Sequence, residues 1–111
     1  MASPSIVLKQ VKTNGSSASE LYEVPEDRRA SLRVHVSTVT AADVDVFIRK
    51  NGEAAADKQY IARGYAVGAN EFEAFPAGGT LLVDDGDIVM VESDQTDTAW
   101  TGNAYEDDIP T

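Results

Sequence analysis

Apolar and polar positions alternate along several short segments of this chain, and turn-forming residues separate those segments. Within residues 31–38, the even positions hold Leu32, Val34, Val36 and a closing Thr38, whereas every odd position is polar. A period of two residues places one side of a strand in the core and the other in water, as in an antiparallel sheet. No long segment shows a competing helical period, so the pattern predicts an all-β protein.

A second alternating run occupies residues 43–49. Val44, Val46 and Ile48 lie on one side, and most residues on the other side are charged. Phe47 interrupts the charged side, which indicates that this side is partly covered.

Turn signals recur about every 8 to 12 residues along the chain, a spacing typical of a sandwich or jelly roll. Asn51-Gly52 and residues 84–87 predict hairpin turns, and residues 88–91 are apolar on both sides, as expected of a central strand. The glycines within 64–68 and 78–79 are interpreted as strand breaks. Further strands are expected at residues 6–11, 21–24, 71–75, 80–83 and 98–105. Another strand is expected after residues 54–56, which we interpret as a loop, although their three alanines could instead form one helical turn. We therefore predict a single-domain antiparallel β-sandwich, jelly-roll-like, with about eight or nine short strands.

The length of 111 residues is that of one domain. We assign residues 1–19 to an amino-terminal strand or arm and its loop, residues 20–106 to the sandwich core, and residues 107–111 to an acidic tail that frays. Cysteine is absent, which excludes disulfides and thiolate metal sites. No apolar run approaches the length of a signal-peptide core or a membrane span, so we expect a soluble protein made in a cytoplasm.

The net charge of −10 hides an uneven distribution along the chain. All nine basic residues lie between Lys9 and Arg63, so residues 64–111 carry a net charge of −11 and the preceding residues a net charge of +1. Free nucleic acid and an anionic membrane surface are not expected as partners, because both require clustered cations. The acidity has two interpretations. It can serve solubility, with adaptation to a salty medium as a variant, or it can form a surface that faces a basic patch on another protein.

Candidate catalytic groups are sparse. His35 is the sole histidine and lies on the polar side of a strand with no serine motif nearby, which favours a surface or interface residue. Asp43 and Asp45 share one strand side, but no signature fixes two carboxylates in one cleft. We therefore expect no enzymatic activity.

An acidic run at residues 84–87 raises the question of calcium, with Asp94 and Asp97 as further oxygen ligands. The run lacks the alternating spacing and distal glutamate of a calcium-binding helix-loop-helix, and a turn explains it. One histidine without cysteine leaves too few ligands for zinc, and neither glycine run is followed by the lysine of a phosphate loop. No metal or cofactor is expected.

Aromatic residues offer a second kind of site. Tyr60, Tyr65 or Trp100 could stack on a sugar, which would make the chain a carbohydrate-binding module. Packing in the core or between subunits is the alternative for Trp100.

Three segments carry a family resemblance. Residues 21–25 (Leu-Tyr-Glu-Val-Pro) open into the strand from Ala30, residues 44–49 lead to Asn51-Gly52, and residues 80–83 lead through Gly86-Asp87 into 88–93. This order resembles the small β-sandwich structural proteins of tailed-phage virions, over roughly two-thirds of the chain. The glycine and lysine that the family usually has after the proline are replaced here by residues 26–29, Glu-Asp-Arg-Arg.

The resemblance implies a viral structural protein, most specifically a capsid decoration (cement) subunit that binds the outer capsid surface and stabilises capsomer junctions. It further implies a homotrimer, a virion location after synthesis in the host cytoplasm, and the major capsid protein or another virion protein as partner. As interface anchors we expect apolar residues of the amino-terminal segment and two late aromatics, namely Ile6, Leu8, Val11, Trp100 and Tyr105. A tail, neck or fibre module is the alternative within the virion, and the carbohydrate-binding module is the alternative outside it.

Overall fold

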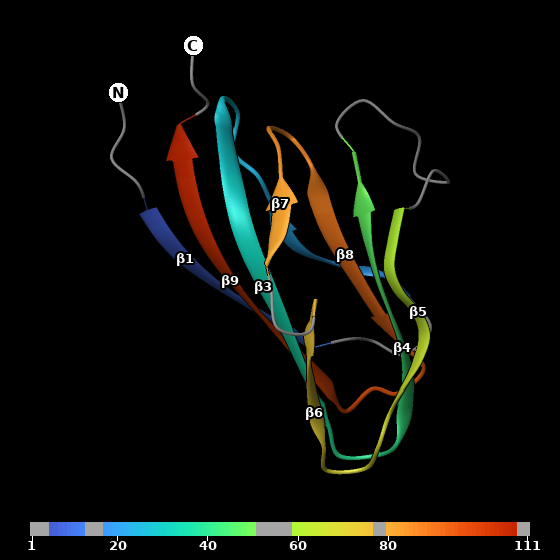
Figure 1. Cartoon of the computed structure of the whole chain (residues 1–111). Coiled ribbons are helices and arrows are strands. Elements are labelled where there is room, and N and C mark those ends of the chain that lie inside the picture. Colours follow the sequence, from blue (N-terminus) through green and yellow to red (C-terminus); the bar gives the residue numbers. More distant parts are fainter. Residues whose placement is uncertain (1–4, 13–16, 51–58, 77–79, 109–111) are drawn as a thin grey trace.

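The computed structural model of the chain describes residues 5–12, 17–50, 59–76 and 80–108. Every regular element in this described part is a β-strand, and the strands form two layers (Figure 1). The strands are β1 (Ser5–Lys12), β2 (Ser19–Glu23), β3 (Arg28–Thr38), β4 (Ala42–Arg49), β5 (Gln59–Val67), β6 (Phe72–Phe75), β7 (Leu81–Val83), β8 (Ile88–Ser93) and β9 (Thr98–Asp108). The predicted all-β class is confirmed.

The two sheets are antiparallel and the chain passes repeatedly between them. The first sheet has the order β1-β9-β3, and β6 and β7 both pair with the remaining side of β3. The second sheet has the order β2-β8-β4-β5. Because β6 pairs with residues 34–37 and β7 with residues 30–32, these two strands together fill a single strand position. This winding is that of a jelly-roll-like β-sandwich, as predicted.

The alternating pattern of β3 is realised in full. Ala30, Leu32, Val34, Val36 and Thr38 are buried, and the intervening residues are exposed or half-buried. β3 pairs with β9 along its whole length, from Arg28 opposite Asp108 to Thr38 opposite Thr98. Half of the buried core residues between the sheets are valines, and the larger side chains among them include Leu32, Phe75 and Trp100. Phe47 is 2% exposed on the outer side of β4, so the covering inferred from the sequence is confirmed.

Two strands contain irregularities at positions where the pairing register shifts. In β2 the shift between Glu20 and Tyr22 lets both Leu21 and Tyr22 be buried. In β5, Gly64 has a φ of +60°, which an L side chain rarely adopts, at a register shift opposite β4. The expectation of a strand break at this glycine is therefore wrong, because the strand continues through it as a bulge. The glycines at 78–79 lie outside the described residues.

One other expectation needs correction. Residues 84–87 do form a turn, closed by the Asp87 amide donating to the Asp84 carbonyl at 2.9 Å. It is not a hairpin, because β7 and β8 belong to different sheets. Asp107 and Asp108, which we assigned to the tail, pair with Arg29 and Arg28 at the end of β9, and fraying of residues 107–111 stays a prediction. The Asn51-Gly52 turn and residues 109–111 lie outside the described part.

Candidate interaction surface

The outer face of the first sheet gathers large apolar side chains that the core does not cover. Ile6 is 84% exposed, Phe72 74%, Leu8 59% and Tyr105 50%. Ile6 and Tyr105 lie directly opposite each other in the β1–β9 pairing, and Leu8 follows on the same side of β1. Phe72 lies on β6, opposite Ser37, on the same outer side. Exposed apolar residues grouped on one face are typical of an interaction site.

Basic residues share this face. Lys12, Arg29 and Arg33 occupy outward positions of β1 and β3, and His35 lies among them. Asp107 is the acidic residue at the outward positions of the described strands of this sheet. Three cations and one carboxylate give a net charge of +2 with neutral histidine. We call this surface the apolar–basic face, defined by Ile6, Leu8, Lys12, Arg29, Arg33, His35, Phe72, Tyr105 and Asp107.

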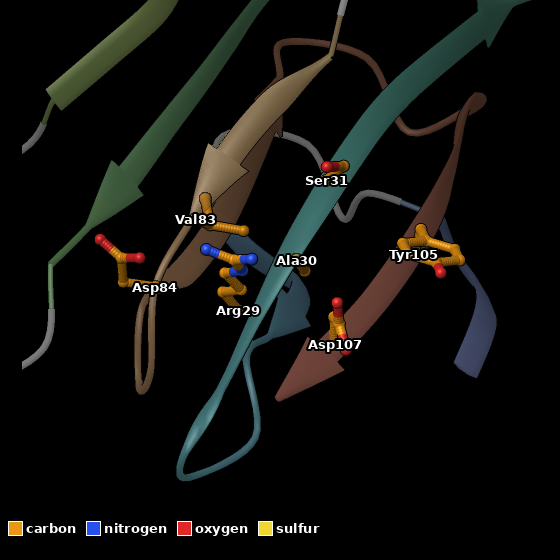
Figure 2. A pocket seen from close by; sticks show the side chains of 7 residues that line it. All are labelled: Arg29, Ala30, Ser31, Val83, Asp84, Tyr105 and Asp107. Atoms are coloured by element: carbon orange, nitrogen blue, oxygen red, sulfur yellow. The ribbon is translucent and has the colours of Figure 1, made fainter. Parts of the chain in front are cut away.

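Open hollows lie along this face, and two of them share lining residues. One, shown in Figure 2, lies where Arg29 extends from β3 towards Val83 and Asp84, with Asp107 and Tyr105 on the neighbouring strand. The other is lined by residues that include Ile6, Arg33 and His35. Ser31 and Tyr105 line both hollows, so the two lie next to each other on this face.

Three of the five anchors expected from the sequence meet on this face. Ile6, Leu8 and Tyr105 are exposed and adjacent, whereas Val11 is half-buried against the core. Trp100 is 1% exposed in the core, so its side chain is not available to a partner. This outcome selects core packing, the alternative weighed for Trp100.

Sequence reasoning missed Phe72 and the cations as members of this face. For Arg33 and His35 the alternating pattern was sufficient to predict an outward position. Both residues alternate with Leu32, Val34 and Val36, which are buried. Phe72 gave no such signal, since its place opposite Ser37 depends on pairing between distant segments.

The outer face of the second sheet has the opposite charge. Its outward positions hold the carboxylates of Glu20, Glu23, Asp43, Asp45 and Glu92, together with Arg49 and Arg63. Five carboxylates and two cations give a net charge of −3. Half-buried Ile88 and Met90 lie between the charges. We call this surface, defined by those nine residues, the acidic face.

Three of the acidic residues considered for calcium, Asp87, Asp94 and Asp97, accept hydrogen bonds from within the chain. Asp87 is 2% exposed, and its carboxylate accepts from Lys50 Nζ at 2.6 Å and from the Asp84 amide at 2.9 Å. Asp94 Oδ1 accepts the Asp43 amide at 3.0 Å. A hydrogen bond from the Thr40 hydroxyl lowers the pKa of Asp97 below its ordinary value. Within the described ranges, no group of three or more His, Cys, Asp or Glu residues could hold a metal ion.

The aromatic residues considered for carbohydrate do not form one platform. The Tyr60 ring contacts Phe47 at a centroid distance of 5.6 Å, and the Arg63 guanidinium lies 4.9 Å from its centroid. Tyr65 packs edge-on against Phe75 of the opposite sheet, at 5.2 Å. Trp100 is in the core, as described above. None of the three therefore offers an unobstructed flat ring next to another.

A buried polar cluster joins the two sheets at one end of the sandwich. The Tyr22 hydroxyl donates a hydrogen bond to Glu106 Oε2, and Arg28 Nε lies 3.6 Å from Glu106 Oε1. Arg28 also contacts Asp108 at 3.0 Å. Burial, reinforced by the hydrogen bond to Glu106, raises the pKa of Tyr22 well above its ordinary value. The arrangement holds a neutral phenol of the second sheet against a carboxylate of the first.

In the described part of the chain, no helix has the length and apolarity that crossing a membrane would require. No protein-family model matches the sequence, and a comparison with curated proteins finds no relative.

Comparison with solved structures relates the fold to viral capsids. The chain is similar to a protein in the acid-stable capsid of Helicobacter pylori bacteriophage KHP30, with a TM-score of 0.57, 12% identity, and coverage of 99% of this chain and 90% of that one. It is also similar to a protein of the T13 particle of infectious bursal disease virus, with a TM-score of 0.51 and 10% identity. That match covers 93% of this chain but only 30% of the bursal disease virus protein. At these identities the likeness shows the fold, and we conclude that the chain has a β-sandwich of the kind found in viral capsids.

Proposed function

We propose that this protein is a virion structural subunit, specifically a decoration or cement subunit on the outer surface of a capsid. The observation that carries this proposal is the likeness to a KHP30 capsid protein over 90% of that protein's length. A chain of similar size and the same fold is therefore part of a capsid. The resemblance of residues 21–25, 44–52 and 80–93 to tailed-phage structural proteins supports the same assignment.

The surface chemistry fits a part that is held by its neighbours. The apolar–basic face presents four large apolar side chains to solvent in an isolated copy. Burying such residues against neighbouring subunits of the shell is favourable, at about 25 cal/mol per Å² of apolar area. A standard interface of roughly 1,600 Å² provides enough contact for stable attachment, and a few buried anchors set the affinity.

The proposal assigns the stabilising effect to capsomer junctions. A subunit that binds only the assembled lattice lowers the free energy of the assembled state, and thereby raises the temperature at which the lattice opens. The partner would be the major capsid protein or another virion protein, and the proposed oligomeric state is a trimer.

The experiment adds the purified protein to capsids that lack it and follows their melting by differential scanning calorimetry. We expect bound protein in sedimented capsids and a higher melting temperature. Leu8→Gln should weaken binding about tenfold, because it removes an exposed apolar contact. The control is Lys9→Gln, which introduces glutamine at the next position of β1, on the opposite side of the strand. This variant should bind like the unaltered protein. Unchanged melting with no protein in the pellet would contradict the proposal.

A quantified gel of purified particles separates this role from a tail, neck or fibre part. A cement subunit occurs in numbers comparable with the capsomers, whereas a tail part occurs in few copies per particle.

A further inference from the structure

The two outer faces of the sandwich are complementary in charge. The apolar–basic face carries a net +2 and the acidic face a net −3, although the whole chain carries −10. Each face spans a whole sheet, and the two sheets lie back to back across the core (Figure 1). One copy therefore presents surfaces of opposite sign on opposite sides.

The acidic face contains an unfavourable arrangement within the isolated chain. Asp45 of β4 lies directly opposite Glu92 of β8, and like charges in such a pair destabilise a sheet. Asp45 Oδ1 accepts the Gly64 amide at 2.6 Å, which satisfies one oxygen but leaves the repulsion in place. A basic surface laid over this pair would remove that repulsion.

The sheet edges are poorly suited to pairing with another chain. Lys9 on β1 and Glu73 on β6 are charges on the core-facing side of their edge strands, a known obstacle to edge-to-edge pairing. The other sheet has a register shift in edge strand β2 and the Gly64 bulge in edge strand β5. The faces are thus better contact surfaces than the edges.

We propose that the apolar–basic face of one copy packs on the acidic face of a second copy. Ile6, Leu8 and Tyr105 would then contact half-buried Ile88 and Met90 on the acidic face of the second copy. Arg29 and Arg33 would approach the carboxylates of that face. The contact joins two different surfaces, so each copy can bind one neighbour on each side. Because the two faces point in opposite directions, copies joined in this way form an open row, and the copy at one end keeps its apolar–basic face available to the shell.

The size of the faces places this contact among small interfaces. At a strand spacing of about 4.8 Å and about 3.3 Å per residue, the strands of the second sheet give a face of about 440 Å², and those of the first sheet about 590 Å². A standard interface buries about 800 Å² per partner, so we expect a weak contact whose occupancy depends on concentration.

The test measures self-association of the full chain without any capsid, by light scattering and sedimentation equilibrium over a range of concentrations. We expect masses that are multiples of 11.9 kDa, and weaker association as salt increases. Arg29→Glu with Arg33→Glu reverses the first face to −2, and Glu20→Lys with Glu92→Lys reverses the second to +1. Each pair alone should raise the dissociation constant about tenfold or more.

Combining all four substitutions makes the faces complementary again with reversed signs, and association should return to near the original strength. Lys9→Glu and Glu26→Lys, which make the same kinds of charge change away from both faces, should leave it unaltered. Circular dichroism verifies that each variant is folded.

Three results would overturn the proposal. The first is a mass of 11.9 kDa at every concentration, and the second is that the arginine substitutions abolish association while the glutamate substitutions leave it unchanged. The third is that the fourfold variant does not recover association. Failure of capsid binding with self-association intact would instead contradict only the proposed function.

Discussion

The buried contact between Tyr22 and Glu106 provides a direct test of how the two sheets are held together. Tyr22 lies on β2 of the second sheet and is 2% exposed, whereas Glu106 lies on β9 of the first and is 7% exposed. Tyr22→Phe removes only the hydroxyl, so the ring keeps its packing and no cavity forms. The change therefore isolates one hydrogen bond between the sheets.

The expected loss is about 2 kcal/mol in the free energy of unfolding, because hydrogen bonds to charged groups contribute about 1.5–3 kcal/mol. Arg28 remains 3.6 Å from the carboxylate, so Glu106 keeps a partner and the loss should not exceed that range. For a domain of this size, about 2 kcal/mol corresponds to a fall of about 8 °C in melting temperature. Glu106→Gln should cost a comparable amount, about 2–3 kcal/mol, because the hydrogen bond from Tyr22 becomes one between neutral groups and the contact with Arg28 at 3.6 Å loses its charge, while Arg28 keeps Asp108 at 3.0 Å.

The raised pKa of Tyr22 adds a pH dependence. Below its ordinary value of 10.0, the stability gained from the protonated phenol is present in full. As the pH rises through 10.0, the unfolded chain loses a proton that folded Tyr22 retains, so stability falls. Tyr22→Phe should make this alkaline decline shallower.

Urea unfolding followed by tryptophan fluorescence, at pH 7 and at several values above 10, measures both effects. Tyr105→Phe is the matched control, since the same atom is removed from a half-exposed tyrosine of β9. If Tyr22→Phe and Tyr105→Phe unfold at the same urea concentration, and decline equally with alkali, the reasoning is refuted.

Two further changes test the core and the backbone. Leu32→Ala, at a fully buried position of β3, should cost about 2–5 kcal/mol through lost burial and a residual cavity, and thermal unfolding showing less than about 1 kcal/mol would contradict its place in the core. Gly64→Ala should cost about 1–2 kcal/mol, because its φ of +60° strains an L residue while no atom lies within 4 Å of the added Cβ. For Gly64→Ala, an unchanged urea midpoint would show that the bulge does not require glycine.

Local patterns were sufficient to predict the strands and the two-layer class. The period of two in residues 31–38 and 43–49 depends only on each strand's own sequence, and both strands have the expected buried sides. The turn residues 84–87 also predicted correctly where β7 ends. Gly86 adopts a φ of +75° in this turn, a conformation that favours glycine. The sequence pattern did not show that this turn crosses between sheets, since pairing partners are set by distant segments.

The surface was predictable only in part, for the same reason. Ile6 and Tyr105 are 99 positions apart in the sequence, and each was chosen for its residue type. Their direct opposition follows from the register of β1 on β9, which no local pattern encodes. Asp107 and Asp108 were assigned to a tail because their pairing partners are distant in the sequence, with 80 positions between Arg28 and Asp108, and no local pattern shows this pairing.

The uneven charge along the chain also gave an incomplete picture. Residues 64–111 carry −11, yet β9, which belongs to that half, lies between β1 and β3 in the apolar–basic face. Folding therefore separates charge by sheet face and not by chain half, and this separation underlies the proposed contact between copies.

The central claim is that this sandwich is a component of a capsid's outer surface. Electron microscopy of purified virions, labelled with an antibody raised against the chain, tests that claim most directly. We predict label distributed over the whole head of the particle. Label confined to the tail or neck, or particles that bind no antibody, would contradict the account.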